Sequence, residues 1–262
     1  MQDFTLTTYR KLLQNLYGNG YSFQTLQDYT KQTEDKVVIL RHDVDRLPEN
    51  ALVIAKIEKE AGIKASYYFR IVKESYDENI IRQIAKMGHE IGYHYENLSE
   101  MSKKKRGMSK EEHFVLAIED FELNLEKFRK IYPVKTICMH GSPISKHDNC
   151  ELWEYYNYRE YGIISEPHFD MNFNEVFYLT DTGRSWNNYK ASVRDKVNSK
   201  FDITIKDTNH LIDKIQNNEL PDKIMINVHP QRWNNKYIPR VSELIKQSVK
   251  NVIKRYLLEF RD

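Results

Sequence analysis

Residues 37–46 read Val37-Val38-Ile39-Leu40-Arg41-His42-Asp43-Val44-Asp45-Arg46. Four consecutive apolar residues open the stretch, and such runs are typical of strands buried on both faces of a parallel sheet. The run gives way to polar residues that include two aspartates. In parallel α/β folds the active site lies at the carboxyl ends of the strands. The stretch therefore predicts a buried strand that ends in chemically active side chains.

Similar apolar runs recur along the chain and alternate with helical patterns. The runs are residues 65–69, 90–93, 136–139 and 224–228, with weaker strand candidates at 162–164 and 176–179. Apolar residues at helical spacing occur at 48–61, 109–131 and 240–260, and Ser109 to Glu112 has the pattern of a capping box. Strands that alternate with helices predict an α/β fold. We expect a β/α barrel with an outer ring of helices, and an open doubly wound sheet is the alternative.

Composition limits the class of protein and its partners. The chain has 262 residues, of which 40% are hydrophobic and 30% charged, so a disordered chain, a collagen and a membrane-embedded protein are excluded. The formal net charge of +2 argues against nucleic acid as a partner. Two cysteines, Cys138 and Cys150, are too few for a disulfide scaffold. No signal peptide or membrane span is visible, so we expect a cytoplasmic protein.

Several of the apolar runs end in histidine or aspartate. Asp43 and Asp45 follow the first run, and His94, His140 and His229 follow three others. Residues two apart on an extended segment point to the same side, so the two carboxylates predict a shared cation, with one as ligand and the other as base. One carboxylate with two histidines is a common zinc site. The alternatives are carboxylates that cap the next helix and histidines that are hydrogen-bonded in the core.

Three of these stretches together resemble the motifs of the NodB-type polysaccharide deacetylases, carbohydrate esterase family 4, and the resemblance extends from about Val37 to Trp233. They are Asp43-Val44-Asp45, Gly88-His89-Glu90-Ile91-Gly92-Tyr93-His94 and Ile226-Asn227-Val228-His229. The resemblance implies a distorted (β/α) barrel, often of seven strands, that removes acetyl groups from N-acetylated sugars with a zinc-like metal. It assigns Asp43 as the base, Asp45 and His94 as metal ligands, and His229 as the general acid.

The chain departs from the family pattern at the second metal-binding histidine. Leu98 stands where the family has that residue. We expect His140 to complete the metal site together with Asp45 and His94, and Glu96 is the rival ligand.

The family's third-motif arginine is also absent. Arg41 or Arg184 would supply its charge beside Asp43. Asp181 fits the fourth motif loosely, so it either pairs with His229 or is a turn residue before Gly183.

These features predict a single domain over residues 1–262, with a helical extension at about 1–33. We expect a metal-dependent hydrolase with one zinc-like ion that deacetylates an amino sugar or polysaccharide precursor in surface-polysaccharide biosynthesis. The side chains expected to bind the sugar are Trp186, Trp233, Tyr95 and Arg232. The alternatives are a carbohydrate-binding relative without catalysis and a hydrolase of another C–N amide bond.

Overall fold

The computed structural model of the chain describes residues 3–105, 107–141, 147–186 and 197–235. Parallel strands and helices alternate through these residues. The strands are β1 Ser22–Gln24, β2 Val37–Val44, β3 Ser66–Phe69, β4 Glu90–Tyr95, β5 Ile137–Met139, β6 Phe177–Thr180 and β7 Lys223–Val228. The helices are α1 Leu6–Gly18, α2 Leu26–Lys31, α3 Pro48–Glu60, α4 Glu78–Lys86, α5 Asn97–Lys104, α6 Lys110–Arg129, α7 Leu152–Tyr155, α8 Pro167–Asp170 and α9 Thr208–Gln216. The predicted helical pattern over 240–260 lies outside the described residues.

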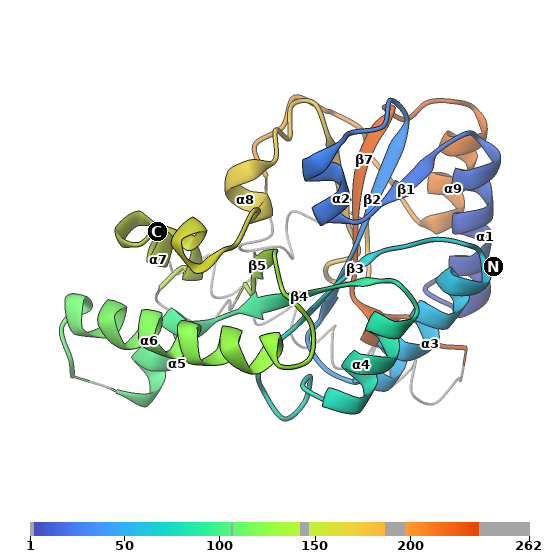
Figure 1. The fold of residues 1–262 in the computed structure, drawn as a ribbon. Coiled ribbons are helices and arrows are strands. Elements are labelled where there is room, and N and C mark those ends of the chain that lie inside the picture. The colour runs from blue at the N-terminus through green and yellow to red at the C-terminus, as the bar shows by residue number, and fades with distance from the viewer. Residues whose placement is uncertain (1–2, 106, 142–146, 187–196, 236–262) are drawn as a thin grey trace.

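All seven strands of the described chain belong to one parallel sheet. Its order is β5-β4-β3-β2-β7-β6, and β1 pairs with the beginning of β2. From β2 the order follows the chain through β3, β4 and β5 on one side, and β7 and then β6 lie on the other. This is the order of a barrel that is open between β5 and β6, because within the described residues no ladder joins those two strands. The sheet is a curled half-barrel (Figure 1), which confirms an α/β fold of barrel type.

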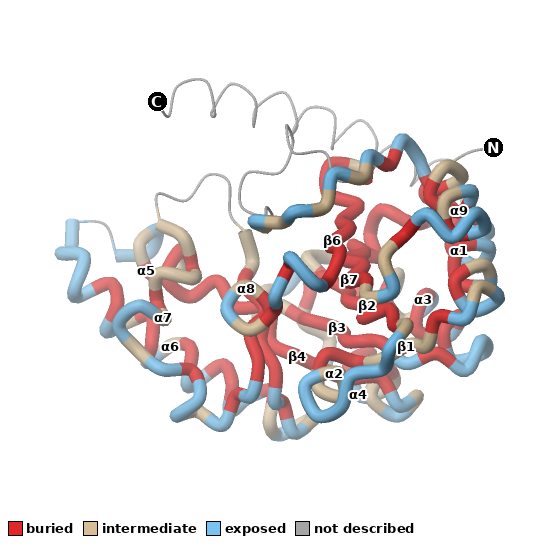
Figure 2. Tube along the Cα trace, turned by 90° about the horizontal axis from the view of Figure 1, so that it is seen from above, coloured by how far each residue is buried: buried red, intermediate tan, exposed pale blue. Residues whose placement is uncertain are grey.

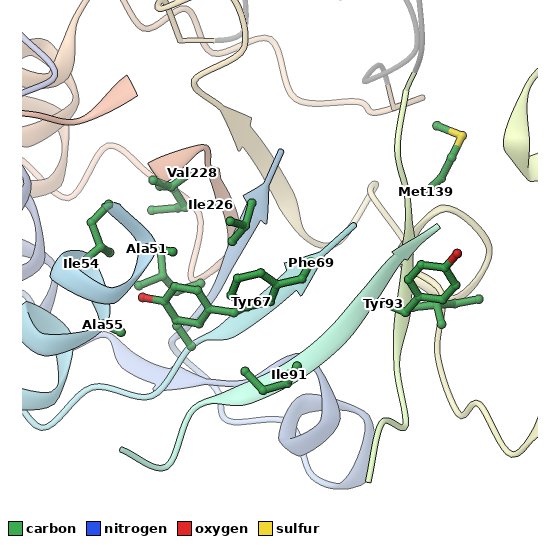
Figure 3. Packing of buried hydrophobic residues seen from close by; sticks show 14 of the residues in the cluster. Ala51, Ile54, Ala55, Tyr67, Phe69, Ile91, Tyr93, Met139, Ile226 and Val228 are labelled. Atoms are coloured by element: carbon green, nitrogen blue, oxygen red, sulfur yellow. The ribbon is translucent and has the colours of Figure 1, made fainter. Parts of the chain in front are cut away.

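Side chains of each strand alternate between the helices and the interior of the half-barrel. On β2, Val38, Leu40 and Val44 belong to the large apolar cluster shared with the helices, whereas Ile39 belongs to a smaller interior cluster. Figure 3 shows residues of the large cluster, with Ala51 of α3 on the side of the sheet that carries outward-facing residues such as Tyr67 and Val228. Arg41 and Asp43 follow Ile39 by two and four residues on the same strand, so their side chains also face the interior.

Two helices of the outer layer, α3 and α6, begin and end close to the predicted boundaries. α3 begins at Pro48. Proline has no backbone N–H, and none is needed there, because the first N–H groups of a helix have no hydrogen-bond partner within the helix. At α6, Ser109 accepts a hydrogen bond from the backbone N–H of Glu112 and Glu112 bonds back to Ser109, so the capping box is confirmed. The strands form the buried centre, and the exposed residues lie on the outer sides of the helices (Figure 2).

Two segments differ from the sequence-based expectation. The amino-terminal region is more than a helical extension, because β1 joins the sheet and α1 packs beside α9 in the outer layer. The prediction of a strand at 162–164 is wrong. Gly162 has φ of 69° and ends a short helix at Tyr158–Tyr161, and only Ser165 forms an isolated bridge, to Thr136.

Candidate active site

Five predicted site residues meet at the carboxyl-terminal edge of the sheet. Asp43 lies near the end of β2 and His94 near the end of β4. Asp45 directly follows β2, His140 follows β5, and His229 follows β7. Asp43 and His94 are inside strands rather than after them, because both strands extend beyond their apolar runs. The alternation of the strands then directs these side chains toward one another inside the half-barrel.

Asp45, His94 and His140 converge on one point. Oδ1 of Asp45 lies 3.2 Å from Nδ1 of His140 and 3.6 Å from Nε2 of His94. The two ring nitrogens are 3.1 Å apart. The side chain of His94 is buried, whereas Asp45 and His140 are 21% and 17% exposed, so the group opens to solvent on their side.

This donor set fits a divalent cation. Nδ1 of His94 lies 2.9 Å from the carbonyl oxygen of Cys138, which requires the proton on Nδ1 and leaves a lone pair on Nε2. Oδ1 of Asp45 is buried and has no well-aligned hydrogen-bond donor among the described residues. A lone pair on His94 and an unsatisfied carboxylate oxygen thus face the same small space. A cation with nitrogen and oxygen ligands would relieve their mutual repulsion.

Protonation within this group is strongly coupled. Burial opposes ionisation of Asp45, but His140 and His94 outweigh it and hold the pKa of Asp45 well below its ordinary value. Burial lowers the pKa of His140. At His94 burial also acts to lower the pKa, but Asp43 and Asp45 raise it overall. A cation at this point would therefore compete with a proton at His94.

The carboxylate of Asp43 forms an ion pair with the guanidinium of Arg41. Nε of Arg41 donates to Oδ1 at 2.9 Å and Nη2 donates to Oδ2 at 2.6 Å, and Nδ2 of Asn227 donates to Oδ2 at 2.9 Å. Burial opposes ionisation, but Arg41 outweighs it and holds the pKa of Asp43 well below its ordinary value. Asp43, His94 and Cys138 form a second group that could hold a metal. The group of Asp45, His94 and His140 fits a metal ion better, because both oxygens of Asp43 already accept hydrogen bonds from Arg41 or Asn227.

His229 is fixed by a buried carboxylate. Its Nδ1 lies 2.6 Å from Oδ1 of Asp181, and Nη1 of Arg232 and Nε1 of Trp233 donate to the same carboxylate at 2.5 Å and 2.7 Å. Arg232 and His229 overcome the effect of burial and lower the pKa of Asp181. With Nδ1 turned to Asp181, Nε2 of His229 lies 4.0 Å from Oδ2 of Asp45. The structure thus brings the loosely matched Asp181 to His229, which in turn faces the candidate cation site.

Glu96 does not take the position of a third ligand. Arg70 binds it with two hydrogen bonds, Nε to Oε1 at 2.7 Å and Nη2 to Oε2 at 2.8 Å. Oε2 of Glu96 lies 3.9 Å from Nε2 of His140, behind the ring as seen from Asp45. Leu98 is fully buried in α5. Of the two rivals, His140 is therefore the residue that joins Asp45 and His94.

The aromatic residues expected to stack on a sugar are instead part of the core. Trp186 and Trp233 are 3% and 1% exposed, and their indole N–H groups donate to Thr208 and Asp181. Tyr95 is fully buried, and its side chain points outward to the helices, like those of Ile91 and Tyr93 on the same strand. None of the three rings has a free face in this structure, because each lies against the protein. The sequence could not distinguish a stacking ring from a packed one.

Of the three arginines expected at the site, Arg41 takes its expected place, whereas Arg184 and Arg232 do not. Arg184 lies over the ring of Phe4 at 5.3 Å and donates to the backbone carbonyl of Arg232 at 3.0 Å. Arg41 is the residue that supplies the charge beside Asp43. Arg232 is buried in its ion pair with Asp181. Arg232 thus holds the carboxylate that fixes His229 rather than facing a substrate.

Three residues of the site were not predicted. Arg70 binds Glu96 and the backbone carbonyl of Asp45, Asn227 binds Asp43, and Gln231 donates to Asp45. Arg70 is the first residue after β3, so the rule applied to the other strand ends would have found it. Asn227 was hidden inside an apolar run, where its position facing the interior is visible only once the strand register is known.

Comparisons with known proteins do not assign a family. No protein-family model matches the chain, and no curated protein shows significant similarity to it. In the described part of the chain, no helix combines the length and the apolar character needed to cross a bilayer.

Proposed function

We propose that this chain is a metal-dependent hydrolase that removes the acetyl group from an N-acetylated amino sugar of a surface-polysaccharide precursor. The convergence of Asp45, His94 and His140, with contacts of 3.1 to 3.6 Å between their ligand atoms, carries the proposal. The resemblance to NodB-type deacetylases supports it, since Asp45 and His94 lie in the matching stretches. The same resemblance favours a zinc-like ion and a seven-stranded barrel of that family.

The cation and Asp43 would act on the acetyl group and the attacking water. When bound, a divalent cation would polarise the acetyl carbonyl and make the attacking water more acidic. Oδ2 of Asp43 lies 3.9 Å from Nε2 of His94. Asp43 would accept the proton of that water. Because Arg41 lowers the pKa of Asp43, this carboxylate is ionised at neutral pH and is a weak base. It therefore requires a water of unusual acidity, which fits its place beside the candidate cation site.

His229 would complete the reaction at the nitrogen. Water adds to the carbonyl carbon, the C–N bond breaks, and the nitrogen leaves with a proton as the free amine. Nε2 of His229 faces the site and would donate that proton, while Asp181 fixes the ring through Nδ1. Asp181 would also stabilise the imidazolium before the proton is given up.

The test is acetate release from a panel of N-acetylated amino sugars, free and nucleotide-linked, by protein loaded with zinc or cobalt. We expect release by the wild type, loss of release in Asp45→Ala and His94→Ala, and wild-type release in His210→Ala, a histidine on α9 outside the site. Wild-type release in His94→Ala would remove this site from the reaction.

Adding other amides to the panel, and measuring sugar binding beside hydrolysis, separates the two alternatives. Release from other amides but from no acetylated sugar would favour a hydrolase of another C–N bond. Tight sugar binding with no metal and no acetate would favour a binding protein. Leu98 in place of the family's second histidine favours that alternative, and the burial of Trp186, Trp233 and Tyr95 disfavours it.

A further inference from the structure

The two oxygens of Asp45 have different surroundings. Oδ1 faces His140 and His94 at 3.2 Å and 3.6 Å. Oδ2 accepts a hydrogen bond from Nε2 of Gln231 at 3.0 Å and lies 4.0 Å from Nε2 of His229. One oxygen is thus turned to the candidate cation and the other is held by the protein.

The surroundings of Gln231 fix its amide toward Oδ2 of Asp45. Its side chain is 5% exposed, so the amide has little freedom to turn toward solvent. The amide orientation follows from chemistry, because the opposite orientation would set the carbonyl oxygen of Gln231 against a carboxylate oxygen. Oε1 of Gln231 is buried and has no hydrogen-bond partner among the described residues. The bond to Asp45 is therefore the polar contact that the structure gives this side chain.

The turn that carries Gln231 also carries His229. The short helix Pro230–Arg232 directly follows His229, whose carbonyl accepts a hydrogen bond from the N–H of Arg232 at 2.9 Å. Nδ2 of Asn50 in α3 donates to the carbonyl of Pro230 at 3.3 Å. Gln231 is thus positioned by the same turn as the proposed acid, and the side chain of Asn50 bonds to the backbone of that turn, whereas Gln231 bonds to the carboxylate of Asp45.

We propose that Gln231 is a positioning residue that holds Asp45 as a one-oxygen ligand and thereby sets the affinity of the cation site. The inference rests on the proposed function, because it requires that Asp45, His94 and His140 bind a metal. A hydrogen bond to the second oxygen keeps that oxygen away from the cation and orients the first. Loss of such a supporting contact commonly weakens metal binding by about 10- to 100-fold.

The experiment compares cobalt binding by the wild type, Gln231→Met and Asn50→Ala. Methionine keeps the length of glutamine and removes the donor. Gln231→Asn, whose amide is one methylene too short to reach, is a second variant in case the first does not fold. Cobalt affinity and the visible absorption spectrum of bound cobalt are measured, and thermal unfolding of the metal-free proteins checks that each is folded.

We expect about 10- to 100-fold weaker cobalt binding and an altered spectrum in Gln231→Met, with Asn50→Ala like the wild type. Equal affinity and an unchanged spectrum in Gln231→Met would overturn the inference while leaving the metal site intact. Equal losses in Gln231→Met and Asn50→Ala would also overturn it, since the effect would belong to the turn. A wild type that binds no cobalt would overturn both the inference and the proposed function.

Discussion

Arg41 and Asp43, two residues apart on β2, form a two-pronged ion pair inside the half-barrel, with donor–acceptor distances of 2.9 Å and 2.6 Å. Both side chains are buried, and the pairing follows from the alternation of the strand, which directs both of them inward. The chain thus places the countercharge of its candidate base on the same strand. The sequence alone does not decide between Arg41 and Arg184 for this role, whereas the strand places Arg41 beside Asp43.

Replacement of Arg41 by methionine leaves a buried carboxylate without its partner. We expect Arg41→Met to raise the pKa of Asp43 and to lower the free energy of unfolding at neutral pH by about 3–5 kcal/mol. Urea denaturation measures the loss. The double variant Arg41→Met/Asp43→Asn removes the stranded charge and should recover part of the stability. An Arg41→Met protein as stable as the wild type would show that the pair is not buried in solution.

Gly92 in β4 is required by the close approach of a ring. A Cβ at this position would lie 2.3 Å from the ring of Tyr68 and 3.0 Å from the carbonyl oxygen of Thr136. Tyr68 has little room to move, because it is fully buried and its hydroxyl bonds to Thr136 at 2.9 Å. We expect Gly92→Ala to reduce the free energy of unfolding by about 1–3 kcal/mol, measured by urea denaturation.

The control for that prediction is Gly18→Ala at the end of α1, where an added Cβ meets nothing within 4 Å. We expect this variant to be as stable as the wild type or slightly more stable. If both glycine variants behaved alike, the packing around Tyr68 would have to be looser than described.

Glu58 predicts a pH-dependent contribution to stability on the outer side of the sheet. It is fully buried in α3 and accepts hydrogen bonds from Tyr9, from Tyr67 at 2.6 Å and from His42 at 2.7 Å. Burial would raise its pKa, but His42 and its other partners lower the pKa overall. A carboxylate with a lowered pKa stabilises the fold above its unfolded pKa, and this contribution is lost as the pH falls through the folded pKa.

The test compares the free energy of unfolding of Glu58→Gln and the wild type across pH. The difference should be largest at neutral pH and should shrink in acid, below the ordinary glutamate pKa of about 4.3. Glu60→Gln is the matched control, because Glu60 is exposed and forms a surface ion pair with Arg10. A difference for Glu58→Gln that does not change with pH would contradict an ionised Glu58.

Asp181→Asn tests the proposed acid without touching the three proposed ligands. Asparagine cannot stabilise an imidazolium at His229 as a carboxylate does, so we expect acetate release to fall by about 10²- to 10⁴-fold. Metal content should stay at the wild-type level, since Asp181 contacts His229, Arg232 and Trp233. Release at the wild-type rate would remove the Asp181–His229 pair from the mechanism.

The sequence predicted most of the sheet, because its central strands contain short, nearly continuous apolar runs. It missed β1, since Ser22–Gln24 has three residues of which two are polar, and this strand depends on pairing with β2. It wrongly predicted a strand at 162–164, where Gly162 adopts a left-handed conformation. Short segments take their structure from tertiary contacts, and periodicity does not detect them.

The candidate site was predictable wherever a titratable residue followed an apolar run, as at Asp45, His140 and His229. Residues that act through another side chain and do not follow an apolar run were not predictable, and Asn227 and Gln231 are examples. The burial of Trp186 and Trp233 was also hidden, because an aromatic residue near a site has the same sequence signature whether it packs or stacks. These features depend on which side chains meet, and that follows only from the register of the sheet.

The most direct test of the account is the metal content of the purified protein and of His140→Ala, measured by elemental analysis after incubation with zinc and dialysis. We expect about one ion per chain in the wild type and loss of that ion in the variant, because His140 is one of three proposed ligands. No bound ion in the wild type after exposure to zinc, cobalt or nickel, or equal metal content in His140→Ala, would contradict it.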